Sequence, residues 1–123
     1  MDRSDIRVRY VLGYRTFRVF CDSDFLLSRF RLGLWEKALD TYAKYFPATG
    51  RKHPLTQYDL VIEPVARNAA APDLPGWVLE MEYVADHFTP SVMAKINDAL
   101  MEDINGTLRA AGVSDVKIHF RAP

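Results

Sequence analysis

Segments with strand-like and helix-like patterns alternate along this chain in an order that few small folds can accommodate. Four segments are rich in β-branched and aromatic residues or alternate between apolar and polar residues, which is typical of strands. Two segments repeat apolar residues every three or four positions, which is typical of helices packed on a core. The strand-like segments are 6–20, 58–65, 77–85 and 116–121, and the helix-like ones are 25–46 and 90–111.

This order predicts an α+β domain of the ferredoxin-like βαββαβ type. Two right-handed crossovers around a central hairpin would give a four-stranded antiparallel sheet with both helices on one face. In chain order of the strands, the sheet would read 4-1-3-2. At 123 residues the chain has the length of one domain, so we expect residues 1–123 to fold around a single core.

The N-terminal segment leaves one alternative open. Val8 and Tyr10 share one face of the predicted strand, and Arg7 and Arg9 share the other. The alternation shifts by one residue after Gly13, which indicates either a hairpin turn or a bulge in one bent strand. The fold can therefore contain an additional N-terminal hairpin strand.

The other predicted elements carry recognisable end signals. Pro64 cannot donate a hydrogen bond, so its strand is expected at an edge of the sheet. Asp22–Asp24 can cap the first helix, in which Gly33 could produce a kink or a break, and Thr89 with Pro90 can open the second. The predicted buried positions are Phe25, Leu26, Phe30, Leu34, Trp35, Leu39, Tyr42 and Phe46 in the first helix, and Met93, Ile96, Leu100, Ile104 and Leu108 in the second.

Charge is balanced overall but divided along the chain. Residues 1–53 contain eleven Lys and Arg against six Asp and Glu, and residues 54–123 contain five against ten. Zero net charge makes nucleic acid an improbable partner, because such proteins usually carry a basic excess. The complementary halves suit contact with another protein or the formation of a homodimer.

The sequence offers few residues for chemistry. One cysteine, Cys21, excludes an internal disulfide, and the three histidines have no metal-ligand spacing, so we expect neither a metal nor a cofactor. The N-terminus lacks the apolar stretch of a secretory signal, and no apolar run approaches the roughly 20 residues that span a bilayer. We expect a cytoplasmic protein that does not bind membranes.

With both helices on one face of the sheet, the other face would be bare and charged. We call it the open face. Basic residues of the first and last strands and glutamates of the third would form a basic side and an acidic side on it. The predicted partner-binding residues are Arg7, Arg9, Glu80, Glu82, Lys117, His119 and Arg121.

The leading hypothesis is a small non-catalytic protein-binding module of the inhibitor, immunity or counter-defence type. It would act through the open face and through loops 47–57 and 66–76. One alternative is an enzyme or small-ligand binder with a pocket near His53 and His87, since histidine titrates near neutral pH. Another alternative is a subunit that builds a larger assembly.

Overall fold

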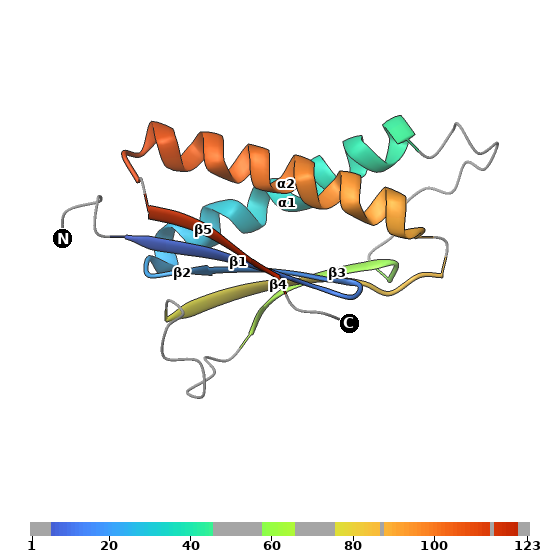
Figure 1. Cartoon of the computed structure of the whole chain (residues 1–123), viewed down its shortest axis with the longest axis horizontal. Helices are drawn as coiled ribbons and strands as arrows, with labels where there is room; N and C mark the ends of the chain where they lie inside the picture. The colour runs from blue at the N-terminus through green and yellow to red at the C-terminus, as the bar shows by residue number, and fades with distance from the viewer. Residues whose placement is uncertain (1–5, 46–57, 66–75, 87, 114, 121–123) are drawn as a thin grey trace.

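A computed structural model describes residues 6–45, 58–65, 76–86, 88–113 and 115–120, with the backbone alone for 64, 65 and 115–120. These residues form two helices and a five-stranded sheet (Figure 1). In chain order the elements are β1 (Arg7–Gly13), β2 (Thr16–Cys21), α1 (Asp24–Tyr45), β3 (Leu60–Val65), β4 (Trp77–Tyr83), α2 (Pro90–Ala110) and β5 (Asp115–Phe120).

The strands are arranged in the order β3-β4-β2-β1-β5. The first four pair antiparallel, whereas β5 pairs parallel with β1. The α+β class, with four antiparallel strands and two helices, is confirmed, and β3 lies at an edge as Pro64 indicated. The βαββαβ order is not confirmed, because residues 6–20 form a hairpin and the order is ββαββαβ. The hairpin reverses the chain once more, so the last strand reaches β1 in the parallel direction.

A two-residue turn at Tyr14 and Arg15 makes this hairpin. Gly13 pairs with Thr16 at its base, and a Cβ atom on Gly13 would lie 2.5 Å from Thr16 Oγ1. Arg15 has a φ angle of 63°, in the left-handed region. That conformation costs a non-glycine residue about 1–2 kcal/mol, so the turn needs compensating contacts.

Arg15 makes those contacts with the end of β4. Its Nε donates to the Tyr83 carbonyl at 2.9 Å, and its Nη2 donates to the Ala85 carbonyl. In return the Tyr83 N–H donates to the Arg15 carbonyl at 2.8 Å. Hydrogen bonds from a charged donor contribute about 1.5–3 kcal/mol, enough to offset the backbone strain and fasten the turn to β4.

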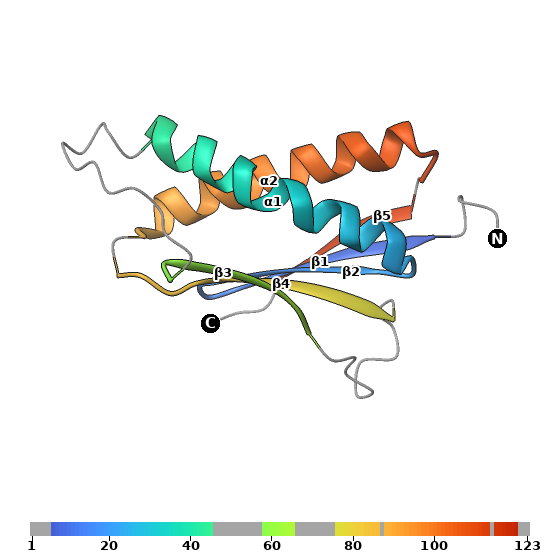
Figure 2. The same ribbon diagram turned by 180° about the vertical axis from the view of Figure 1, so that it is seen from behind.

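Both helices lie on one face of the sheet, as predicted, and the core fills the space between the layers (Figures 1 and 2). α1 runs through Gly33 without a break. A Cβ atom on Gly33 would lie 3.7 Å from Asp103 Oδ2 of α2, an ordinary van der Waals contact, so Gly33 faces α2 without being required by packing.

The predicted apolar stripe of α2 is confirmed at all five positions, but that of α1 is only partly correct. Phe25 is 68% exposed, whereas Leu27 is buried in its place. The buried stripe follows Leu26, Phe30 and Leu34, which puts Phe25 on the solvent side of the first turn. Trp35 and Leu39 are partly buried, and Phe46 lies outside the described residues.

Hydroxyl groups cap both helices. Ser23 Oγ accepts the Leu26 N–H at 3.2 Å, and Thr89 Oγ1 accepts the Val92 N–H at 3.2 Å. Each cap satisfies one backbone donor that the first turn leaves without a helical partner. At the other end of α2, Gly112 adopts a φ of 80°, which confirms it as the closing residue.

Two buried tyrosines tie the sheet to α2. Tyr10 of β1 donates its hydroxyl to Asn105 Oδ1 at 2.7 Å, and Tyr83 of β4 donates to Asn97 Oδ1 at 2.6 Å. Burial raises the pKa of both tyrosine hydroxyls, so they remain protonated donors at neutral pH. The two bonds fix the position of α2 along the sheet.

We predict that Tyr10→Phe lowers the free energy of unfolding by about 1–2 kcal/mol, because Asn105 then loses its donor in a partly buried site. Urea denaturation followed by circular dichroism measures the change. Tyr14→Phe is the control, since the Tyr14 side chain is exposed and its stability should stay within about 0.5 kcal/mol of wild type. Equal stability of the Tyr10→Phe protein and wild type would contradict this role.

Candidate functional site

The open face is the side of the sheet away from the helices. Val8, Tyr10, Val19, Leu79 and Met81 point into the core under the helices, so their neighbours in sequence point to the open face. Strand register sets Arg18 between Val11 and Glu80, and Phe20 between Arg9 and Val78. The described open-face residues of the three central strands are Arg7, Arg9, Val11, Gly13, Thr16, Arg18, Phe20, Val78, Glu80 and Glu82.

Arg7 does not extend toward a partner but is paired with Asp22. Its Nε lies 2.9 Å from Asp22 Oδ2 and its Nη2 lies 3.2 Å from Oδ1. The Arg7 N–H also donates to Asp22 Oδ2, at 3.1 Å. These bonds from Arg7 hold the pKa of the Asp22 carboxyl below its usual value of 3.8. The pair closes the open end of the β1–β2 hairpin.

Arg18 and Glu80 form the second ion pair, across β2 and β4, with Arg18 Nε 2.5 Å from Glu80 Oε2. The expected pairing of arginine and glutamate on neighbouring strands is present, but the arginine comes from β2. Sequence reasoning left Arg18 out of the site because the hairpin at Gly13 remained open. Had the hairpin been assigned, the alternation from Phe17 would have placed Arg18 on this face.

Arg9 was expected to be an exposed basic residue of the first strand. It lies on the open face as expected, but it is only 7% exposed. Its Nη1 donates to the Val8 carbonyl at 3.0 Å, so the side chain lies along the sheet. A long arginine stem covers apolar surface well, and the neighbouring Val11 and Phe20 are buried too. The expected exposure of Arg9 is therefore wrong, while its role as a partner contact stays a prediction.

The acidic side of the open face has exposed carboxylates among the described residues. Glu82 and Glu63 are exposed, on β4 and β3, and Glu80 is half-buried in its ion pair. On β5, register sets Lys117 beside Arg9 and His119 beside Val11. The described residues do not include Arg121, His53, His87 or the loops 47–57 and 66–75.

Three exposed apolar side chains belong to segments that meet at one end of the sheet, where β1 turns into β2. Tyr14 is 64% exposed, Tyr58 75% and Val84 48%. Backbone hydrogen bonds bring their segments together. Val84 N–H donates to Asp59, next to Tyr58, at 2.9 Å, and Tyr83 N–H donates to Arg15, next to Tyr14. We call Tyr14, Tyr58 and Val84 the sheet-end patch.

Sequence reasoning missed this patch. The sequence analysis places Tyr14 within the strand-like segment 6–20 and Val84 within 77–85, and gives neither residue a role at the surface. The one available signal was the pair of bulky residues in turn segments, Tyr14 after Gly13 and Tyr58 before Asp59. Large apolar residues in turns are exposed unless a neighbouring element covers them.

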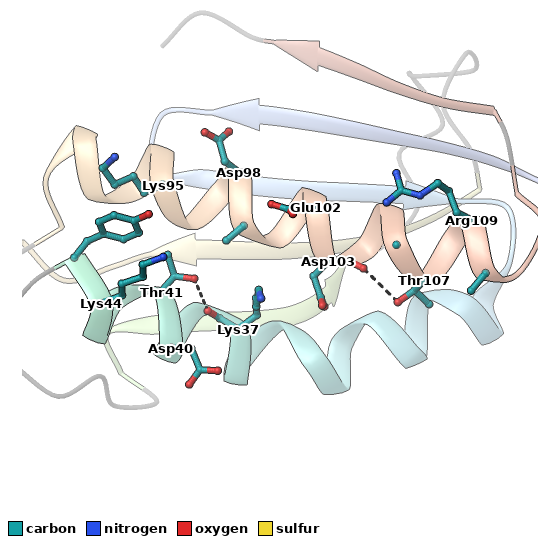
Figure 3. Close-up of a pocket in the computed structure, with 14 residues that line it drawn as sticks. Lys37, Asp40, Thr41, Lys44, Lys95, Asp98, Glu102, Asp103, Thr107 and Arg109 are labelled. Atoms are coloured by element: carbon teal, nitrogen blue, oxygen red, sulfur yellow. Dashed lines mark hydrogen bonds between the residues drawn. The ribbon is translucent and has the colours of Figure 1, made fainter.

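A groove of about 860 Å³ runs between α1 and α2 (Figure 3). Lys44 and Lys95 place their Nζ atoms 5.3 and 4.7 Å from the centre of the Tyr45 ring at one end. Basic and acidic side chains are mixed along it, so the groove does not select a ligand by one sign of charge. The charged lining residues are Lys37, Asp40, Lys44, Lys95, Asp98, Glu102, Asp103 and Arg109.

The described residues offer little reactive chemistry. Burial raises the pKa of the Cys21 thiol to about 11, which suppresses the nucleophilic thiolate. Burial, together with Asp59, raises the pKa of Tyr42 to about 12. Within the described ranges, no group of three His, Cys, Asp or Glu side chains is placed to hold a metal ion. Neither helix described here is long and apolar enough to span a membrane.

We predict that Asp22→Asn destabilises the protein in a pH-dependent way. The depressed pKa of Asp22 stabilises the fold above the normal value of 3.8, and this contribution disappears as pH falls through the lower folded-state pKa. The stability gap between wild type and variant, measured by urea denaturation, should be largest near pH 7 and shrink toward pH 2. Asp98→Asn, at an exposed position of α2, is the control. A gap that stays constant from pH 7 to pH 2 would refute the role of this ion pair.

Comparisons with known proteins do not assign this chain. It matches no protein-family model, no curated protein and no solved structure. The surfaces that it exposes are the basis for a functional proposal.

Proposed function

We propose that this chain is a small cytoplasmic protein-binding module that acts by occupying a surface of another protein, without catalysis, as inhibitor and immunity proteins do. Its contact surface is the sheet-end patch with the acidic residues beside it. The observation that carries the proposal is the exposure of Tyr14, Tyr58 and Val84 on three adjoining backbone segments. Large exposed apolar side chains on adjoining segments are a feature that interaction sites share.

The composition of the patch supports a protein partner. Tyrosine is enriched among the residues that dominate binding energy, because it buries a large area and loses few rotamers. The backbone segments of Tyr14 and Tyr58 both bond to the segment of Val84, so a partner that covers this end of the sheet could contact all three side chains. Phe25 and Leu32 are at least as exposed, but both come from one side of a single element, α1.

The patch is also held rigidly. Arg15 fastens the hairpin turn to the end of β4 through the Tyr83 and Ala85 carbonyls. The Asp59 carbonyl accepts the N–H groups of both Val84 and Ala85, which fastens the start of β3 to the same point. A surface that is ordered before binding loses less conformational entropy in the complex.

Charge around the patch indicates the chemistry of the partner. Glu82 and Asp86 are exposed beside it, and Glu63 is exposed farther along β3. A partner with a basic rim around an apolar centre would be complementary, and its association rate would fall with added salt. Glu82 belongs to the predicted open-face site as well, so the proposed surface keeps the acidic side of that site.

Two other functions stay as alternatives. A pocket near His53 and His87 would make the chain an enzyme or a small-ligand binder. A chain with no net charge repels its own copies weakly, so an assembly subunit or homodimer is the second. Light scattering over a concentration series distinguishes self-assembly from the binding of a different protein, because an assembly subunit gains mass without any other protein present.

We predict that the double variant Tyr14→Ser/Val84→Ser weakens partner binding at least about tenfold, because two central side chains lose their buried area. Phe25→Ser/Leu32→Ser removes two apolar side chains of α1 that are at least as exposed, and serves as the matched control. Proteins captured from lysate by each immobilised variant are quantified, and the partner that depends on the patch is purified for titration calorimetry.

The control variant should bind that partner as wild type does, and raising the salt concentration should slow association for both. If the α1 variant loses the captured protein while the patch variant keeps it, the contact surface lies on α1 and the proposal is wrong.

A further inference from the structure

The outer edge of β3 forms a second candidate binding surface, separate from the sheet-end patch. β3 is the last strand on its side, and no described strand pairs with its outer edge. We propose that an extended segment of another protein binds there as a sixth strand, with backbone hydrogen bonds to Leu60 and Ile62. This inference does not depend on the function proposed above.

The register decides which backbone groups face outward. The Val84 N–H donates to the Asp59 carbonyl, so these two residues form a hydrogen-bonded pair of the antiparallel ladder. Hydrogen-bonded and non-bonded pairs alternate along such a ladder. Residues 61, 63 and 65 therefore bond to β4, and residues 60, 62 and 64 direct their N–H and C=O groups away from it.

Pro64 fits this pattern. Its missing N–H falls on the outward side, where the ladder to β4 needs no donor, so proline is tolerated inside β3. The edge then offers the N–H and C=O of Leu60, those of Ile62, and the C=O of Pro64. Five adjoining groups are enough to pair about three residues of an added strand.

A hollow beside the edge can receive side chains of that strand. It has a volume of about 300 Å³ and lies between α1 and β3, where Arg31 and Trp35 face Leu60, Val61 and Ile62. An added strand would lie about 4.8 Å outside β3, and every second side chain would point toward the helix layer. Those side chains would enter the hollow and pack on Trp35 and Ile62.

Charges at the edge define the segment further. Arg31 at the hollow favours an acidic or polar residue of the added strand beside its apolar ones. The exposed Glu63 on the open-face side favours a basic residue of the added strand. A second copy of this chain fits less well. The two-fold register that uses every outward group of residues 60 and 62 sets Glu63 opposite Asp59 of the other copy, and like charges in that position repel.

We predict that wild-type protein, used to select from a displayed library of random dodecapeptides, enriches extended sequences with apolar residues at every second position and basic residues between them. In hydrogen-exchange experiments, the selected peptide should protect the Leu60 and Ile62 amides. Ile62→Pro should weaken peptide binding at least about tenfold, because proline removes one outward N–H donor without breaking a hydrogen bond to β4. Ile62→Ala loses comparable packing but keeps the N–H, so it should bind the peptide more tightly than Ile62→Pro does.

Tyr14→Ser should leave peptide binding unchanged, which separates this edge from the sheet-end patch. The proposal fails if the library yields no binder, if the Leu60 and Ile62 amides stay unprotected in the complex, or if Ile62→Pro binds the peptide as tightly as Ile62→Ala. It also fails if wild type sediments as a dimer that Ile62→Pro dissociates, since the occupant would then be a second copy. The exchange measurement uses wild type alone and decides the matter even if Ile62→Pro does not fold.

Discussion

The hydrogen bonds from Arg15 to the end of β4 are the constraint on which the described surfaces depend. They hold a strained, left-handed residue in a two-residue turn, and the turn divides residues 7–21 into two central strands. From that division follow the five-stranded order, the parallel pairing of β5 with β1, and the exposure of Tyr14 at the tip. Because the same bonds fasten the turn to β4, the ends of three strands form one surface.

Ion pairing explains why few charged side chains of the central strands are left unpaired by the described residues, although charge is divided along the sequence. The pair of Arg18 with Glu80 joins the basic half of the sequence to the acidic half across β2 and β4. Arg7 is neutralised within its own half by Asp22. The acidic side keeps Glu63 and Glu82 exposed. Among the described residues, the surface along β3 and β4 is thus acidic beside exposed apolar groups, and both proposed contacts adjoin it.

Local sequence signals predicted the helices, their caps, the edge position of β3 and the core of α2: apolar periodicity for the helices and the core, capping residues for the caps, and Pro64 for the edge. Periodicity did not show whether residues 6–20 form a hairpin, because Gly13 is compatible with a turn or a bulge. The turn is held by bonds from Arg15 to residues such as Tyr83, 68 positions away in sequence. The candidate site depended on whether the hairpin forms: alternation put Arg9 on the correct face, but could not show that its side chain lies along the sheet. Exposure at strand ends, as for Tyr14 and Val84, follows from tertiary neighbours and not from pattern.

The claim that Arg15 fastens the sheet end is tested most directly by amide hydrogen exchange in wild type and in Arg15→Ala. In wild type the Tyr83 N–H, which donates to the Arg15 carbonyl, should be protected. In the variant it should exchange at least about tenfold faster, while the amide of Val19, in the middle of β2, keeps its protection. Unchanged protection of Tyr83 in a folded Arg15→Ala protein would show that the turn holds without the guanidinium, and would contradict the account.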